Sequence, residues 1–275
     1  MLNFNGNLQK ADTFYLSYSN RSIAYGDALY ETIIVTSSKI HFLEAHYFRL
    51  MASMRMLRMK IPLYFTLEYF EEQILTTVKA NILDTRVAVK LTVFRDSEGG
   101  ILPVSNTIKF YITVKNNKTS LPESDFEVDL FKDFYKSQDQ LSTLLTSAQP
   151  LQITASIFAN ENNFDSCLLL NTSKNVIEAI NANIFLVNAD KCIVTPPLSD
   201  GCRNGIIRKK IIEIVKKSAD LKLEERSISP FEIQKAEELF LTSAIIGIQS
   251  VTKYRKKVFL KEMASHLRNQ LENLI

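Results

Sequence analysis

Four segments of the chain hold residues whose types and spacing could do chemistry. In the first half, "YGDALYET" (25–32) places two carboxylates and two tyrosines beside a glycine at the start of a predicted strand. "HFLEAHYFRL" (41–50) places His46 and Arg49 three residues apart, so a helix brings them onto one face. An arginine in such a place suits a phosphate or carboxylate ligand. A turn glycine with a paired aspartate, and an ordinary surface pair, are the structural alternatives.

The other two segments lie in the second half of the chain. Glu178 in "NVIEAINANIFLV" (175–187) precedes an apolar strand, where a carboxylate needs either a partner or solvent. A surface glutamate is the structural alternative. Gly205 in "DGCRNGIIRKK" (200–210) directly precedes a predicted helix, and the first backbone N–H groups of a helix can bind an anion.

A gap in the basic residues separates the two halves. The chain has 33 Lys and Arg among 275 residues, yet none lies between Lys136 and Lys174. The gap contains "LSTLLTSAQPL" (141–151). It has two explanations: a buried segment that excludes charge, or the loss of a charge that a functional site needs.

The elements that must position these residues follow from hydrophobic periodicity. Residues 28–43 predict a strand, a Ser-Ser turn and a short second strand, and residues 86–95 and 108–115 predict two more strands. Helices are predicted over 44–61, before Pro62, and over 66–82, with Thr66 as N-cap. This pattern indicates a small α+β domain over 1–117.

A segment of turn composition, "NNKTSLPES" (116–124), predicts the domain linker. The large domain of 122–275 mixes its elements more finely, which indicates an α/β arrangement. "YRKKVFLK" (254–261) is interpreted as a solvated loop. Strands are predicted over 167–171, 183–188, 192–195, 222–228 and 238–245, and helices over 151–162, 204–219, 229–236 and 261–275.

Composition excludes several classes of function. A net charge of +3 without a basic cluster interleaved with aromatics argues against nucleic-acid binding. No apolar run approaches the ~20 residues that span a bilayer, and the N-terminus does not resemble a signal peptide. We therefore expect a cytoplasmic protein with reduced thiols and no metal site. The residues on which this rests are three cysteines (Cys167, Cys192, Cys202) and three histidines (His41, His46, His266).

The order of the segments resembles the class IV aminotransferases, which include branched-chain and D-amino acid aminotransferases and aminodeoxychorismate lyase. The segments that carry the resemblance run in unbroken order from about Tyr25 to Tyr254: "YGDALYET", "HYFRL", "VIEAINANIFLV", "TPPLSDGCRNGIIR", "LEERSI" and "AEELFLTSAIIGIQSVTKY". The resemblance implies the pyridoxal-phosphate (PLP) fold type IV of D-amino acid aminotransferase. That fold has an α+β N-terminal domain and an α/β C-terminal domain with a barrel-like sheet. The resemblance also implies a cofactor cleft at the domain junction and a homodimer.

The same resemblance assigns cofactor contacts to particular residues. Arg49 of the "HYFRL" segment would grip the phosphate of pyridoxal 5'-phosphate, and Tyr30 would line the substrate side. Glu178 would pair with the protonated pyridine nitrogen and keep the ring an electron sink. Backbone N–H groups of Ile206 and Ile207 would face the cofactor from the helix N-terminus.

One departure from the family concerns the lysine that forms the Schiff base. Counting back from Leu168–Asn171 and matching "LSTL" places that lysine column on Leu145. A leucine can neither form an imine nor move a proton. The sequence therefore predicts that no catalytic lysine stands at this position, and the gap in basic residues acquires a functional meaning.

Other departures affect the cofactor contacts. Ile207 and Ala244 stand where the family often has threonines, and each lost hydroxyl costs roughly 1–3 kcal/mol if it is not replaced. Ile180 and Ala182 stand where small hydroxyl residues are common. Together these losses argue against cofactor binding.

Three hypotheses follow. The first is a degenerate or repurposed homologue that has lost Schiff-base chemistry, whose cleft could bind a small anion through Arg49, Tyr30 and Glu178. The second is a working PLP-dependent aminotransferase or aminodeoxychorismate lyase with a lysine from elsewhere. Lys136 is the nearby candidate, but it lies nine residues before position 145 and would require an insertion. The third is a homodimeric scaffold without a small ligand.

Overall fold

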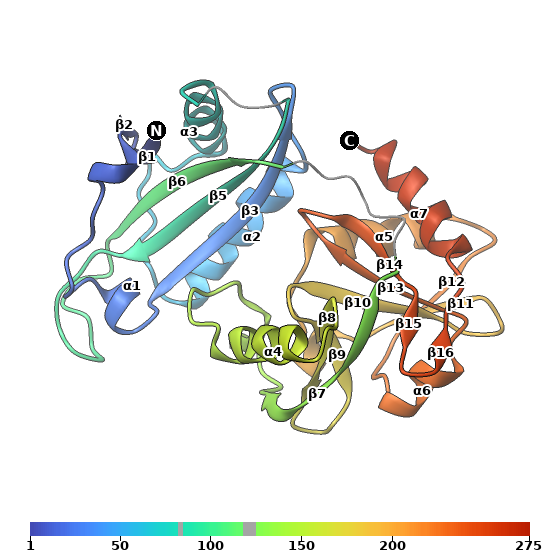
Figure 1. Cartoon of the computed structure of the whole chain (residues 1–275). Helices are drawn as coiled ribbons and strands as arrows, with labels where there is room; N and C mark the ends of the chain where they lie inside the picture. The colour runs from blue at the N-terminus through green and yellow to red at the C-terminus, as the bar shows by residue number, and fades with distance from the viewer. Residues whose placement is uncertain (82–84, 118–124) are drawn as a thin grey trace. The chain divides into compact units, whose positions relative to one another are not determined.

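The computed structural model describes residues 1–81, 85–117 and 125–275 (Figure 1). These residues gather into two compact units. The first unit holds the described residues before position 118 together with Leu145–Ala148, and the second holds the remaining described residues. The predicted large domain included Leu145–Ala148, whereas these residues pack with the first unit. Most of the predicted linker at 116–124 lies outside the described residues.

The first unit is built on a six-stranded antiparallel sheet in the order β2-β1-β6-β5-β3-β4. Its strands are β1 (Leu2–Phe4), β2 (Asn7–Gln9), β3 (Ala28–Thr36), β4 (Lys39–Ile40), β5 (Arg86–Arg95) and β6 (Ile108–Asn116). The prediction of β5 is confirmed at both ends, because its alternating apolar residues bury one face of the sheet. β1 and β2 were not predicted, since three residues are too few to show alternation.

Two helices pack against this sheet: α2 (Leu43–Met56) contacts β3, and α3 (Leu67–Lys79) contacts β6 (Figure 1). Thr66 caps α3 as predicted, since its Oγ1 accepts a hydrogen bond of 3.2 Å from the Tyr69 amide. The predicted end of α2 at residue 61 is wrong, because Arg58 adopts a left-handed conformation with φ of 55°. Two short helices complete the unit, η1 (Ala11–Thr13) and α1 (Arg21–Ala24).

The second unit contains a ten-stranded mixed sheet with a main order of β12-β11-β10-β9-β8-β7-β15-β16, in which β13 pairs with both β10 and β14. Its strands are β7 (Glu127–Lys136), β8 (Ser166–Asn171), β9 (Val176–Ala179), β10 (Ala182–Val187), β11 (Cys192–Thr195), β12 (Lys222–Glu225), β13 (Glu238–Ser243), β14 (Gly247–Val251), β15 (Lys253–Tyr254) and β16 (Lys257–Val258). Its helices are η2 (Leu141–Thr143), α4 (Pro150–Glu161), η3 (Leu198–Asp200), α5 (Ile206–Lys217), α6 (Pro230–Lys235) and α7 (Glu262–Glu272).

The interpretation of "YRKKVFLK" as a loop is wrong. This segment contributes to the hairpin of β15 and β16. β15 also pairs in parallel with the start of β7, where Tyr254 lies opposite Val128. Such a pairing joins distant parts of the chain, so a local pattern could not reveal it.

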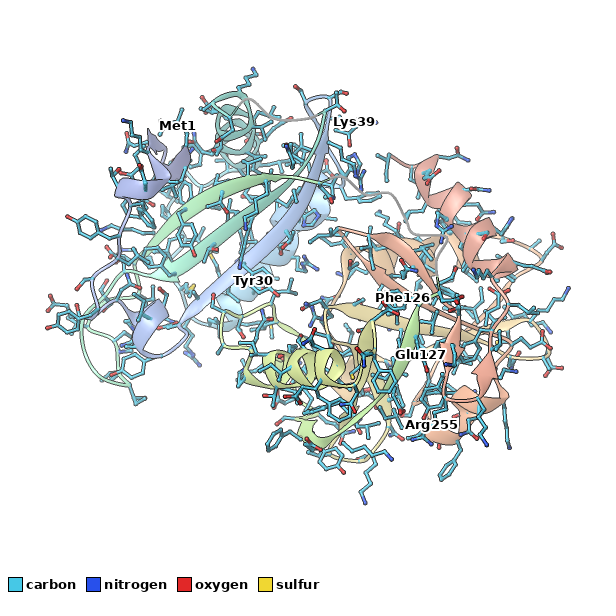
Figure 2. The ribbon with its side chains drawn as sticks, viewed as in Figure 1. Met1, Tyr30, Lys39, Phe126, Glu127 and Arg255 are labelled. Atoms are coloured by element: carbon cyan, nitrogen blue, oxygen red, sulfur yellow. The ribbon has the colours of Figure 1, made fainter. Side chains whose placement is uncertain are left out.

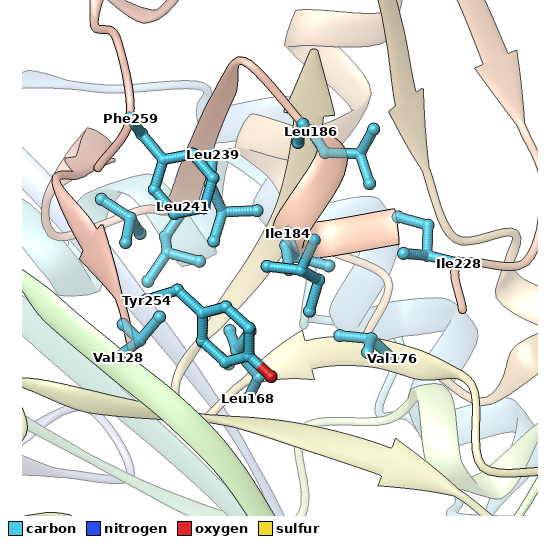
Figure 3. Packing of buried hydrophobic residues seen from close by; sticks show 14 of the residues in the cluster. Val128, Leu168, Val176, Ile184, Leu186, Ile228, Leu239, Leu241, Tyr254 and Phe259 are labelled. Carbon is cyan, nitrogen blue, oxygen red and sulfur yellow. The ribbon is translucent and has the colours of Figure 1, made fainter. Parts of the chain in front are cut away.

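The core of the second unit lies on both faces of β10, all of whose residues are buried. On one face, Ile184 and Leu186 join a cluster that includes Leu239 and Tyr254 (Figure 3). On the other face, Phe185 stacks on Phe240 of β13 with ring centroids 5.0 Å apart. Burial on both faces means that β10 lies between two layers of side chains.

No helix in the described part of the chain has both the length and the apolar character needed to cross a bilayer.

Candidate functional site

Glu31, Arg49 and His46 form a buried ion-pair cluster in the first unit. Glu31 lies in β3, and α2 brings His46 and Arg49 onto one face, as their spacing predicted. Glu31 Oε1 accepts a hydrogen bond of 2.8 Å from Arg49 Nε. Its Oε2 accepts another from Arg49 Nη2 and lies 2.6 Å from His46 Nδ1. Arg49 is therefore held by two parallel hydrogen bonds to a carboxylate of its own unit.

The charges within this cluster balance one another. Burial raises the pKa of the Glu31 carboxyl, but the charge of Arg49 and the hydrogen bonds from His46 and Arg49 hold it below its ordinary value. Burial lowers the pKa of His46, and Glu31 opposes this only in part. Glu31 is consequently ionised at neutral pH, and its negative charge compensates that of Arg49.

Tyr30 and Leu145 lie next to each other in the first unit. The Tyr30 amide donates a hydrogen bond of 3.0 Å to the Leu145 carbonyl, so the backbone at Leu145 runs beside β3. Figure 2 labels Tyr30 on this strand. The Nζ of the exposed Lys90, on β5, lies 4.9 Å from the centroid of the Tyr30 ring, within range of a cation–π contact. The sequence prediction treated Tyr30 and Leu145 separately, and the structure brings them together.

A second contact fixes the same segment against the start of β3. The Ser147 amide donates a hydrogen bond of 3.0 Å to the Ala28 carbonyl. Gly26 has φ of +64°, and a Cβ on it would lie 2.8 Å from the Ala148 Cβ. Only glycine permits both this backbone conformation and this close approach. The glycine of "YGDALYET" therefore determines how closely the Leu145 segment can pack.

Glu178 lies at the centre of a second ion-pair cluster, in the second unit. β9 carries Glu178, Lys136 is the last residue of β7, and Arg203 precedes α5. Glu178 Oε1 accepts a hydrogen bond of 2.8 Å from Lys136 Nζ. Its Oε2 accepts from the Arg203 backbone amide at 2.7 Å and from Arg203 Nε at 3.3 Å. The structural alternative of a surface glutamate is wrong, since the Glu178 side chain is 0% exposed.

The electrostatics of this cluster also favour the ionised carboxylate. Burial raises the pKa of Glu178, but the charges of Arg203 and Lys136 and the hydrogen bonds from them hold it below its ordinary value. The side chains of Lys136 and Arg203 are each 12% exposed. All three charges are therefore largely withdrawn from water and depend on one another.

The residues before α5 pack closely beside this cluster. Asn183 Nδ2 donates a hydrogen bond of 2.8 Å to the Arg203 carbonyl. A Cβ on Gly205 would lie 2.0 Å from Asn183 Oδ1, so a larger residue there would displace the Asn183 side chain. α5 begins at Ile206, and its N-cap residue is Gly205, which has no side chain to cap it. Ile206 and Ile207 are therefore the first two residues of α5, and the contact of their amides with a cofactor stays a prediction.

Ile207 and Ala244, which stand where the family often has threonines, carry no hydroxyl group. The Ile207 side chain is 4% exposed, and Ala244 follows β13 in the turn before β14. Among the residues that the structure describes, no group of three or more His, Cys, Asp or Glu side chains could hold a metal ion.

Two members of the Glu178 cluster were not predicted as site residues. Lys136 was considered only as a substitute lysine, and Arg203 was part of a motif without an assigned role. They lie 42 and 25 residues from Glu178 along the chain. The signal that could have found them is electrostatic, because a buried carboxylate requires nearby cations or hydrogen-bond donors.

Comparisons with known proteins agree with the motif order. Residues 28–254 match the family described as amino-transferase class IV. A Thermotoga maritima protein named "Probable branched-chain-amino-acid aminotransferase" is 26% identical over 262 residues, which cover 94% of this chain and 88% of that protein. The aminodeoxychorismate lyase of Vibrio harveyi is 21% identical over 243 residues, which cover 86% of this chain and 87% of that protein.

A solved structure agrees with the fold. The branched-chain amino acid aminotransferase from Thermobaculum terrenum, described as its PLP form, superposes with a TM-score of 0.87. The alignment covers 99% of this chain and 92% of that chain at 20% identity. The fold is therefore the PLP fold type IV that the motifs implied. Because the family match also spans most of the sequence, this chain belongs to the class IV aminotransferases.

Proposed function

We propose that this protein is a class IV aminotransferase homologue that does not transaminate through a lysine imine. The observation that carries the proposal is the presence of Leu145 where the resemblance puts the Schiff-base lysine. The Leu145 carbonyl accepts a hydrogen bond from the Tyr30 amide. A lysine in that column would supply both the imine nitrogen and the proton carrier, and leucine supplies neither.

The residues present do not fit bound pyridoxal phosphate in the way that the family resemblance requires. The Glu178 carboxylate, which would pair with the pyridine nitrogen, already accepts hydrogen bonds on both oxygens from Lys136 and Arg203. Ile207 and Ala244 offer no hydroxyl to the phosphate. The relative from Thermobaculum terrenum is described with PLP, but that description concerns its own residues.

The competing proposal is a working enzyme that uses Lys136 as the imine lysine. Against it stands the 2.8 Å contact between Lys136 Nζ and Glu178 Oε1. By the family resemblance, Glu178 contacts the ring nitrogen, and the imine forms on the opposite side of the ring. A lysine in contact with Glu178 is therefore on the wrong side for that chemistry.

A repurposed site would take a small anion. The ammonium group of Lys90, on β5, lies over the Tyr30 ring and offers a positive charge beside this residue of β3. The charge of Arg49, in contrast, is already compensated by Glu31. We further propose that the protein is a cytoplasmic homodimer.

The test is an absorbance scan of the purified protein with added pyridoxal phosphate, followed by borohydride reduction and peptide mapping. We expect no aldimine band and no single labelled lysine. The matched variants are Leu145→Lys and Leu144→Lys, which place a new lysine on adjacent half-buried residues. Selective label at the new side chain is expected only when Leu145→Lys is combined with Lys136→Met and Arg203→Leu, and not when Leu144→Lys is combined with the same pair, because in the single variants Glu178 still accepts hydrogen bonds from Lys136 and Arg203. A reduced adduct at one lysine of the wild-type protein would refute the proposal and identify the imine residue.

A further inference from the structure

The Glu178 carboxylate is saturated by groups of its own chain. Each oxygen has a cationic donor, with Lys136 Nζ at 2.8 Å from Oε1 and the Arg203 amide and Nε at 2.7 and 3.3 Å from Oε2. Glu178 is 0% exposed, so neither oxygen faces solvent. A ligand that needed this carboxylate would first have to displace one of these donors.

Arg203 is held at several points and cannot simply swing away. Its Nη2 donates a hydrogen bond of 2.9 Å to the Ile180 carbonyl. Its own carbonyl accepts hydrogen bonds from Asn183 Nδ2 at 2.8 Å and from the Gly205 amide at 2.9 Å. Displacing Arg203 from Glu178 would therefore disturb the backbone that leads into α5.

Lys136 is anchored by the sheet. Its carbonyl accepts a hydrogen bond of 3.1 Å from the Thr172 amide, and its register partner in β8 is Asn171. The lysine side chain is 12% exposed. Removing its counter-charge would leave a largely buried cation without compensation, which is strongly unfavourable.

We infer that Lys136 and Arg203 are the permanent internal partners of Glu178 and close this carboxylate to any pyridinium-type ligand. The inference rests on the proposed function and deepens it, because the pairing of Glu178 with Lys136 and Arg203 opposes cofactor binding independently of the missing lysine. The cluster then has a structural role, joining β7, β9 and the residues before α5.

The first test is a set of thermal melts. Glu178→Gln should lower the melting temperature by roughly 10 °C, because two buried cations lose their counter-charge. Lys136→Met and Arg203→Leu should each cost only a few degrees, since each leaves one neutral pair. The double variant Lys136→Met with Arg203→Leu should be severely destabilised, because the buried Glu178 carboxylate then loses both of the cations that pair with it. Adding Glu178→Gln to this double variant should recover most of the lost melting temperature. The matched control is Lys253→Met, which removes a lysine 2.8 Å from Glu127 at an exposed site and should change little.

The second test adds pyridoxine 5'-phosphate, which carries the pyridine ring but has no aldehyde and cannot form an imine. It should not raise the melting temperature of the wild-type protein. It should raise that of Lys136→Met with Arg203→Leu, because the ring nitrogen can then supply the missing positive charge. Adding Glu178→Gln should abolish that rise.

Two results would overturn the inference: a ligand-induced rise in the wild-type protein that Glu178→Gln removes, or no rise in the double variant. If the double variant does not fold, the thermal melts of the single variants test the inference. An equal loss of melting temperature from Glu178→Gln with and without Lys136→Met would show that Glu178 and Lys136 are not coupled, and would overturn it. Because the probe cannot form an imine, a failure here leaves the proposed function standing, whereas a borohydride adduct refutes the proposed function separately.

Discussion

Glu31 and Glu178 occupy equivalent electrostatic situations in separate units. Each is a fully buried carboxylate held by an arginine and one further group, His46 for Glu31 and Lys136 for Glu178. Burying such charges is costly unless their partners are in place. These residues therefore contribute to specifying the local structure, whatever the site binds.

His41 is a buried residue whose titration should be visible in the stability of the protein. It is 7% exposed, and its Nε2 has no hydrogen-bond partner among the described residues. Burial, together with the charges of Arg86, Lys39 and His46, lowers the pKa of His41 from 6.5 to about 4. The unfolded chain therefore binds a proton at His41 at a higher pH than the folded chain does.

From this difference we predict that the free energy of unfolding falls by about 1–3 kcal/mol as the pH decreases from 6.5 to 4. The contribution is fully present above pH 6.5 and is lost as the pH passes through the folded pKa. Urea unfolding at several pH values measures it. His41→Phe should flatten this part of the profile, while His266→Gln, at an exposed position of α7, should leave it unchanged. Equal slopes in wild type and His41→Phe would contradict the assignment.

At the scale of elements, the docking of Leu145–Ala148 beside β3 depends on Gly26. Gly26→Ala should lower the free energy of unfolding by about 1–3 kcal/mol, because alanine is strained at positive φ and its Cβ would meet Ala148. Hydrogen exchange at the Tyr30 amide, which donates to the Leu145 carbonyl, should accelerate. Gly100→Ala is the matched control, since a Cβ there meets nothing within 4 Å. Unchanged exchange at Tyr30 would show that the close approach is not needed.

How far the sequence predicts these elements depends on where their stabilising contacts lie. β5 was predicted at both ends because its pattern is local. β7 was not predicted, since only its first half is mainly buried and the second half carries exposed residues. The positions of Arg49 and His46 followed from helical spacing. The partners of Glu178 did not, because the sheet register that brings Lys136 to it is a property of the folded chain.

The motif order predicted the family and the fold, and it could do so without knowledge of a single contact. What it could not predict is that the Glu178 carboxylate would be paired with two cations of the same chain, Lys136 and Arg203. Arg203 lies in a loop, where its side-chain direction is set by hydrogen bonds to Glu178 and to the Ile180 carbonyl rather than by any local pattern.

At the scale of the whole molecule, the three cysteines can report the unfolding of the second unit. All three are buried and lie in the second unit. Burial raises the pKa of Cys167 to about 12 and that of Cys202 to about 11, so both thiols stay protonated at neutral pH. Their labelling therefore requires that the second unit open.

We predict that a thiol reagent leaves the native protein essentially unmodified at pH 7.5 and labels three thiols in denaturant. The labelling midpoint measures the unfolding of the second unit. Ser17→Cys, at an exposed position of the first unit, should add one rapidly labelled thiol and serve as the positive control. Rapid labelling of the wild-type protein without denaturant would contradict the burial of the thiols.

The gap in basic residues also decides how the protein is digested. Trypsin cuts after lysine and arginine, so the denatured chain yields one long peptide from Ser137 to Lys174. This peptide carries Leu145, α4 and β8. Its N-terminus at Ser137 is produced only if trypsin cuts after Lys136. A reduced pyridoxyl group on Lys136 would block that cut and fuse the peptide to its neighbour. Mass spectrometry would therefore detect a modification of Lys136 as a missed cleavage, from the peptide mass alone.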